Sequence, residues 1–212
     1  MLKTGPFQDH ADQYDRWFKE NRSVYEVELR TIRSFITDNR RSLEVGVGTG
    51  RFAAPLGIRI GIEPAESMRA IALKRKVNVL GAAAEHLPFK DSSFGLVMMI
   101  TVVCFVNDID RTFKEAFRVL SKDGSMVVGM MDRSGPLGLR YSERKQDSLF
   151  YGQATFYSVD EILEIMKRTG FNNFSFRQSI FGDISKTSGD EAVKAGYGTG
   201  SFVAIRGKKR EV

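Results

Sequence analysis

The sequence is poor in the residues that form disulfides and bind transition metals. It contains one cysteine, Cys104, and two histidines, His10 and His86, among 212 residues. A single thiol excludes an intrachain disulfide framework and any cysteine-based zinc or iron–sulfur centre. Two widely separated histidines without cysteine partners do not suggest a metal site either. We therefore expect no metal, and we expect Cys104, which lies in an apolar run, to be a core residue.

Long hydrophobic runs are also absent. The longest run has eleven residues, Leu96 to Val106, and is interrupted only by Thr101. A helix of that length cannot cross ~30 Å of hydrocarbon. The N-terminal segment has no apolar stretch of the kind that a secretory signal requires. The sequence thus predicts a cytoplasmic protein that does not enter a membrane.

Charge is present in excess of one sign but without long runs. The chain has 32 Lys and Arg against 26 Asp and Glu, and 42% of its residues are hydrophobic, which excludes an intrinsically disordered protein. The basic residues are interleaved with acids, apart from short runs at 74–76 and 208–210. No zinc finger, RNA-recognition signature or aromatic–basic alternation accompanies them. Nucleic acid is therefore a partner that the charge permits but that no motif supports.

The spacing of apolar residues predicts strands alternating with helices. Residues 11–37 have apolar side chains at steps of three, four and seven, which is typical of an amphipathic helix. The predicted strands that follow are Ser42–Val47, Ile58–Ile62, Val77–Leu80, Leu96–Val102 and Ser125–Met131. The predicted helices between them are Arg51–Leu56, Ser67–Arg75 and Asp110–Leu120. This alternation predicts a parallel sheet covered by helices on both faces.

The last third of the chain has a different character. Residues 132–156 lose periodicity and gather Gly, Pro, Arg, Ser and aromatic residues, which suggests a long loop or lid. A capping box at 158–161 then opens a helix that is expected to end at Gly170. Two late strands, Phe174–Phe176 and Phe202–Arg206, are predicted to be antiparallel. The glycine cluster at 196–200 directly precedes a strand, so we interpret it as a turn.

A glycine-rich segment between the first strand and the next predicted helix is the most informative feature. Gly46, Gly48 and Gly50 allow a tight turn and let a ligand approach the main chain. The dinucleotide fingerprint would place its third glycine where this chain has Arg51. Glu63, at the end of the second strand, is positioned to accept hydrogen bonds from ribose hydroxyls. The pattern favours a nucleoside site without the signature of a pyrophosphate binder.

Further motifs follow the glycine loop in a fixed order. They are Glu44 before the first glycine, Gly81–Phe89, Asp91–Val97, Glu115–Leu120 with Lys122–Gly124, and Tyr157–Glu161 through Thr169–Phe171. With these motifs, residues 40–207 resemble the class I S-adenosylmethionine-dependent methyltransferases.

The resemblance implies an α/β Rossmann-like fold. In that family the sheet is doubly wound, mostly parallel and seven-stranded, with antiparallel last strands and helices on both faces. Residues 1–212 would then form a single methyltransferase domain. Its parts would be a helical cap (1–41), a cofactor-binding half (42–131), a lid (132–156), and a C-terminal helix with strands (157–207).

The resemblance also implies S-adenosylmethionine as cofactor and S-adenosylhomocysteine as product. The cofactor-binding residues that it implies are Glu44, Gly46, Gly48, Gly50, Glu63, Pro64, Met68, Ala84, Glu85 and Thr101. Glu44 and the glycines would hold the methionine part, and Thr101 would face the methyl group. Glu63 would bind the ribose hydroxyls, and the other residues would lie around the adenine, where Ala83 replaces the aspartate common in the family.

The acceptor is expected to be a small molecule methylated at O or N by in-line displacement. Tyr14, Trp17 and Phe105 are candidates to line its site, although packing of the N-terminal helix explains the first two equally well. No residue is identifiable as a general base.

Three alternatives stay open. A methyltransferase acting on RNA or protein fits the basic charge, but residues 101–104 lack the Asn/Asp-Pro-Pro-aromatic motif of enzymes that methylate nucleobase amines. A non-catalytic cofactor-binding protein is also compatible, because no motif specifies a catalytic group. A nicotinamide-dependent oxidoreductase is disfavoured by Arg51.

Overall fold

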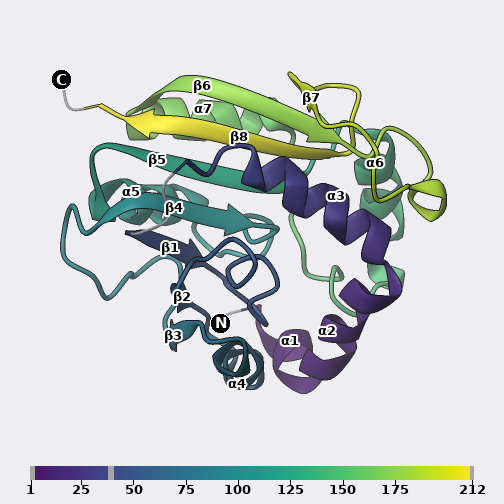
Figure 1. The fold of residues 1–212 in the computed structure, drawn as a ribbon, viewed down its shortest axis with the longest axis horizontal. Helices are drawn as coiled ribbons and strands as arrows, with labels where there is room; N and C mark the ends of the chain where they lie inside the picture. The colour runs from purple at the N-terminus through teal and green to yellow at the C-terminus, as the bar shows by residue number, and fades with distance from the viewer. Residues whose placement is uncertain (1–2, 38–40, 211–212) are drawn as a thin grey trace.

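The structure is a computed structural model that describes residues 3–37 and 41–210 (Figure 1). The described residues form one sheet with the strand order β3-β2-β1-β4-β5-β8-β6-β7. In chain order the strands are β1 (Ser42–Val45), β2 (Ile60–Ile62), β3 (Asn78–Leu80), β4 (Phe94–Ile100), β5 (Leu120–Met131), β6 (Phe171–Ser179), β7 (Lys194–Ala195) and β8 (Phe202–Lys209). Strands β1 to β5 pair in parallel, whereas β8 is antiparallel to both β5 and β6. The Rossmann-like sheet is therefore confirmed, with the two-residue β7 added at one edge to the seven strands expected.

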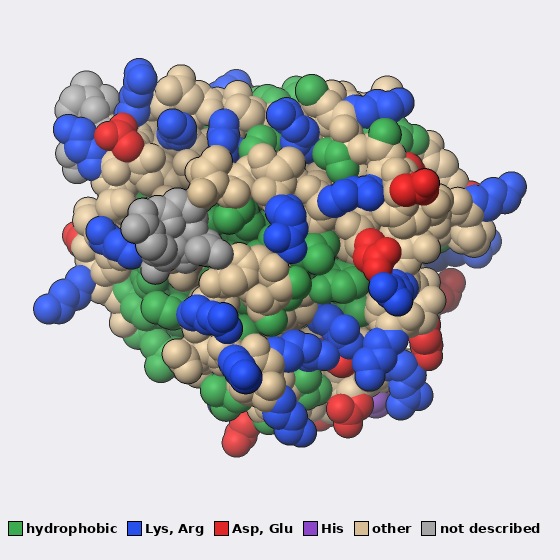
Figure 2. Space-filling model, viewed as in Figure 1, with side chains coloured by type: hydrophobic (Ala, Val, Ile, Leu, Met, Phe, Trp, Pro, Cys, Tyr) green, Lys and Arg blue, Asp and Glu red, His purple; other side chains and the backbone are tan. Residues whose placement is uncertain are grey.

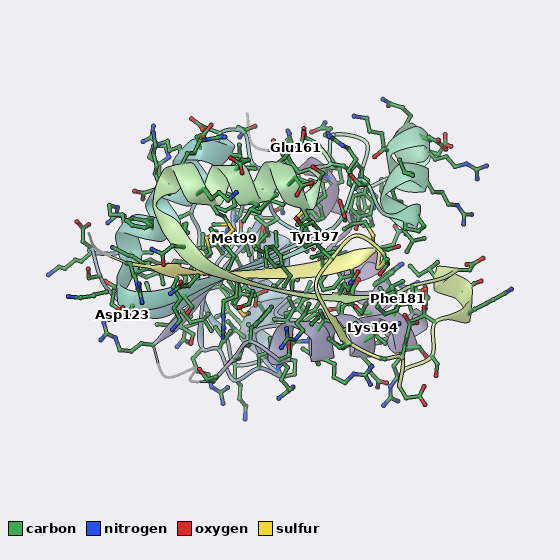
Figure 3. The ribbon with its side chains drawn as sticks, turned by 90° about the horizontal axis from the view of Figure 1, so that it is seen from above. Met99, Asp123, Glu161, Phe181, Lys194 and Tyr197 are labelled. Atoms are coloured by element: carbon green, nitrogen blue, oxygen red, sulfur yellow. The ribbon has the colours of Figure 1, made fainter. Side chains whose placement is uncertain are left out.

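Helices cover both faces of this sheet (Figure 1). They are α1 (Gly5–Asp9), α2 (Ala11–Glu20), α3 (Arg22–Arg33), α4 (Glu66–Lys74), α5 (Ile109–Val119), α6 (Pro136–Arg144) and α7 (Val159–Thr169), with short 3₁₀ turns at Lys145–Asp147 and Ile184–Lys186. Helices α5 and α7 bury Met99 of β4 in one hydrophobic core (Figure 3). Helix α3 packs against the other face, in a second core. No helix among the described residues is both long and apolar enough to cross a bilayer.

Local sequence signals at helix ends are confirmed. Ser158 accepts a hydrogen bond from the Glu161 amide and the Glu161 side chain accepts one from Ser158, which completes the capping box of α7. Gly170 ends that helix in the left-handed conformation, with φ of 111°. The glycine cluster at 196–200 forms the turn between β7 and β8, as expected. Beside that turn, Lys194 Nζ lies 4.4 Å from the ring centroid of Phe181 (Figure 3).

Several predicted elements differ from the structure. The predicted helix Arg51–Leu56 is wrong, since this segment forms turns. Pro55 has no N–H to donate, and Gly57 leaves the helical region with φ of 74°. The helix predicted over 11–37 is two helices, α2 and α3, separated at Asn21. The segment 132–156 is not a continuous loop, because it contains α6, which begins with proline in the first turn after Gly135. Strand β6 is longer than the predicted 174–176.

Candidate functional site

A cavity of about 210 Å³ lies at the carboxyl ends of the parallel strands β1, β2 and β4, where ligands bind in open α/β sheets. The predicted cofactor residues that line it are Gly46, Gly48, Glu63, Pro64, Met68, Ala84, Glu85 and Thr101. The predicted acceptor residues Tyr14, Trp17 and Phe105 line the same cavity. Glu44 and Gly50 do not belong to its lining. The fold thus brings together residues from α2 to β4, and the two exceptions have separate explanations.

The glycine loop needs its glycines for different reasons. Gly46, Gly48 and Gly50 have φ of 69°, 54° and 80°, in the region that favours glycine. A Cβ atom at Gly46 would lie 2.2 Å from Cγ2 of Val102, so this glycine lets the loop contact the segment after β4. A Cβ at Gly50 would lie 3.4 Å from Cα of Ala72 in α4. Gly50 therefore serves the contact between the loop and α4.

Glu63 connects the end of β2 to the glycine loop. Its Oε2 accepts a hydrogen bond from the Gly48 amide at 3.0 Å, and its Oε1 accepts one from the Ala65 amide at 2.9 Å. Burial raises the pKa of Glu63, although these two amides and the charge of Arg69 oppose the rise. Each carboxylate oxygen has two lone pairs, so both oxygens retain acceptor capacity toward the cavity.

Glu44 lies buried behind the glycine loop, with 1% of its surface exposed. Its Oε2 has no hydrogen-bond partner among the described residues. Burial raises the pKa of Glu44 well above its ordinary value, opposed by a hydrogen bond from the Ala53 backbone and reinforced by the nearby Glu63 charge. A buried oxygen without a donor costs ~1–3 kcal/mol, so this carboxyl would gain from a donor.

Asp15 of α2 forms an ion-pair network with the glycine loop. Arg51 donates two hydrogen bonds to the carboxylate, at 2.8 and 2.7 Å, and Arg75 donates a third at 2.8 Å. Burial alone raises the pKa of Asp15, but the hydrogen bonds from both arginines outweigh it and lower the pKa to about 2. Arg75 also donates to the Thr49 carbonyl at 2.7 Å. Arg51, which replaces the third glycine of the dinucleotide fingerprint, thus fastens α2 to the loop.

Aromatic rings from two distant segments meet over the cavity. Phe150, in the predicted lid, lies 5.4 Å from the ring centroid of Phe7 and 5.6 Å from that of Tyr14. Tyr151 stacks on Phe105, with centroids 5.9 Å apart. Sequence reasoning noted the aromatic residues of 132–156 but assigned none of them to the site, because their contacts with α1 and α2 are long-range.

Two residues after β4 also face the cavity. Thr101 has φ of 54°, which is unusual for a β-branched residue, and its amide donates to the Gly129 carbonyl at 2.8 Å. Such strain concentrates at functional sites. Burial raises the pKa of the Cys104 thiol to about 12. The thiol is therefore protonated at neutral pH, and Cys104 packs with Ala154 and Phe156 in a small core cluster, as expected for a core residue.

Glu85 orders a neighbouring loop. Its side chain is 7% exposed, and Oε1 accepts hydrogen bonds from the amides of Asn107 and Asp108 at 2.7 and 3.3 Å. Asp108 is the N-cap of α5. The carboxylate therefore fixes the start of α5 while its side chain lines the cavity.

Glu28 is a cavity residue that sequence reasoning missed. It lies on α3, is 6% exposed, and no described residue donates a hydrogen bond or forms an ion pair to it. Burial raises its pKa to about 8. The signal was present in the sequence, since Glu28 is four residues from both Val24 and Ile32 on the buried face of an amphipathic helix.

Comparisons with known proteins agree with this geometry. A family model described as "Methyltransferase domain" matches residues 43–128. A crystal structure from Thermotoga maritima, described as a SAM-dependent methyltransferase and possible histamine N-methyltransferase, is 44% identical, with a TM-score of 0.95 over 98% of this chain and 100% of that one. An uncharacterized protein of Methanocaldococcus jannaschii is 43% identical over 96% of this chain and 98% of its own length. The malonyl-[acyl-carrier protein] O-methyltransferase of Geobacter sulfurreducens is 28% identical, with 79% of this chain and 68% of that protein covered.

The chain belongs to the S-adenosylmethionine-dependent methyltransferases. It is an enzyme that uses S-adenosylmethionine as methyl donor. The residues described above fit that cofactor, because the Glu63 carboxylate, which keeps acceptor capacity, and the loop glycines Gly46 and Gly48 line one cavity.

Proposed function

We propose that the protein methylates a small molecule that binds inside the cavity, at an O or N atom. The observation that carries this proposal is the aromatic cover, in which Phe7 of α1 and Phe150 of the segment 132–156 contact each other and both line the cavity. A mostly apolar cavity with aromatic rings from two segments in its wall suits a small acceptor better than a polymer. Lys and Arg side chains, by contrast, are spread over the face that carries α3, with hydrophobic side chains between them (Figure 2).

On this proposal the cofactor lies along the carboxyl ends of β1, β2 and β4. Glu63 binds the ribose hydroxyls through its free lone pairs, while Gly46 and Gly48, which line the cavity, lie against the methionine part. Glu44 lies behind the loop that would hold the cofactor's amino end, and its Oε2, which lacks a donor among the described residues, is an acceptor available on that side. Pro64, Met68, Ala84 and Glu85 surround the adenine.

The cofactor supplies a methyl group that its sulfonium already activates. The chain therefore has to bind, orient and desolvate the two reactants, and orientation alone contributes several kcal/mol in general. Thr101, held at its strained φ beside the glycine loop, faces the reacting end. The segment 132–156 excludes water from the acceptor side.

The relatives are described as different kinds of methyltransferase, so their names do not identify the acceptor atom of this protein. One is an O-methyltransferase, one is described as a possible histamine N-methyltransferase, and the Tropheryma whipplei relatives are demethylmenaquinone methyltransferases. The acceptor has to be inferred from this chain's own cavity.

Calorimetry with S-adenosylhomocysteine tests the cofactor assignment, and tritium transfer from labelled cofactor to a panel of small amines and alcohols tests the acceptor class. We expect micromolar binding and transfer to at least one panel compound. Transfer to RNA or protein instead, with the steep salt dependence of phosphate contacts in the RNA case, would contradict the small-molecule assignment.

A further inference from the structure

One acid in the cavity lacks the partners that the other acids have. Glu63 and Glu85 each accept hydrogen bonds from two backbone amides, whereas Glu28 accepts none from any described residue. Among the described residues that line the cavity, Lys3 is the only Lys or Arg. It forms no ion pair with Glu28. Glu28 is therefore a buried carboxyl that is free to meet a ligand.

Its surroundings are aromatic. Tyr14, Tyr141 and Tyr151 line the same cavity as Glu28, and its charge contributes to the raised pKa of each. Trp17 lines the same space. The faces of such rings attract cations, with the strongest attraction for Trp.

A buried carboxylate is costly unless an opposite charge or several donors accompany it. Without a ligand, burial therefore favours the neutral form of Glu28. An uncharged acceptor would leave it in that form, and an anionic acceptor would oppose its ionisation further. A cation satisfies the carboxylate and the ring faces together. Glu28 also lies outside the set of residues proposed to bind the cofactor, and it lines the cavity with the proposed acceptor residues Tyr14 and Trp17, so we assign its ligand to the acceptor side.

We propose that the methyl acceptor is a small organic cation whose protonated amine is separate from the atom that receives the methyl group, and that Glu28 is the residue that selects it by pairing with its positive charge. This inference rests on the proposed small-molecule function. Glu28 acts here in recognition, with the aromatic rings providing shape and the carboxylate providing the preference for charge.

The test compares three probes of similar size on the protein saturated with S-adenosylhomocysteine: 2-phenylethylamine, 2-phenylethanol and 3-phenylpropanoate. Calorimetry should show that the amine binds at least tenfold more tightly than the alcohol, with no detectable binding of the carboxylate. Glu28→Gln should abolish that preference and change the affinity for the alcohol by less than twofold.

The matched control is Glu26→Gln, which removes the same charge from the same helix at a site paired with Arg22 outside the cavity. It should keep the preference for the amine. Unchanged binding of S-adenosylhomocysteine shows that each variant is folded. If the wild-type protein does not bind S-adenosylhomocysteine, the proposed function itself is contradicted. Normal cofactor binding with no preference for the amine, or with a preference that survives Glu28→Gln, would overturn the role of Glu28 alone.

Discussion

The buried position of Glu28 has a consequence for stability that is independent of any ligand. In the folded protein burial raises the pKa of Glu28 to about 8, from the ordinary value of 4.5. A group whose folded pKa lies above its unfolded pKa contributes stability that is fully present below the unfolded pKa. That contribution is lost as the pH rises through the folded pKa. The wild-type protein should therefore lose stability between about pH 4.5 and pH 8, relative to a variant that cannot ionise at this position.

Glu28→Gln is such a variant, because the amide has nearly the same shape and no charge. At 1.36 kcal/mol for each pH unit, the wild-type protein should lose about 5 kcal/mol of unfolding free energy relative to this variant between pH 4.5 and pH 8. About 3 kcal/mol of that loss should occur below pH 7. The other buried acids with raised pKa values, Glu44 and Glu63, affect both proteins equally and cancel in the comparison.

The assay is urea unfolding of both proteins at half-unit steps from pH 5 to pH 8.5, followed by circular dichroism. The stability of Glu28→Gln minus that of the wild type should be small at pH 5 and should increase steadily toward pH 8. Glu26→Gln should show no such increase, since Glu26 is partly exposed beside Arg22. A difference that stays constant across this range would refute the reasoning, because it would mean that Glu28 ionises with an ordinary pKa.

Three further variants test the glycine loop and its supports. Asp15→Asn removes the counter-charge of Arg51 and should cost about 2 kcal/mol of unfolding free energy at pH 7, measured by urea titration; a loss below ~0.5 kcal/mol, the level of an exposed pair, would contradict the network. Glu63→Ala should weaken binding of S-adenosylhomocysteine by ~1–3 kcal/mol in calorimetry, and unchanged affinity would refute the ribose assignment. Gly46→Ala should destabilise the fold by at least ~1–2 kcal/mol, because a Cβ there meets Val102 at positive φ. Adding Val102→Ala should recover part of that loss, as measured by thermal melting. The absence of any recovery would show that the clash is not the cause.

Much of the fold was predictable because its signals are local. The parallel strands are short apolar runs, the capping box at Ser158 depends on residues three positions apart, and Gly170 marks its own helix end. The one wrong helix, 51–56, had a local reason too, since Pro55 interrupts its hydrogen bonds. The extent of α6 was not predictable, because the segment 132–156 has no regular apolar spacing.

The sequence by itself determined the class of protein and the location of the cofactor loop, because the glycines and Glu63 are placed by neighbouring residues along the chain and by the order of the strands. Only the tertiary structure decided what those residues touch. Asp15 and Arg51 are 36 positions apart, and no pattern in either segment announces their contact. Glu28 reads in the sequence as one more acid on a helix, and it becomes a candidate for recognition only when packing buries it, without a described partner, in the wall of the cavity. Long-range packing sets burial, and burial sets the chemistry of a carboxyl group.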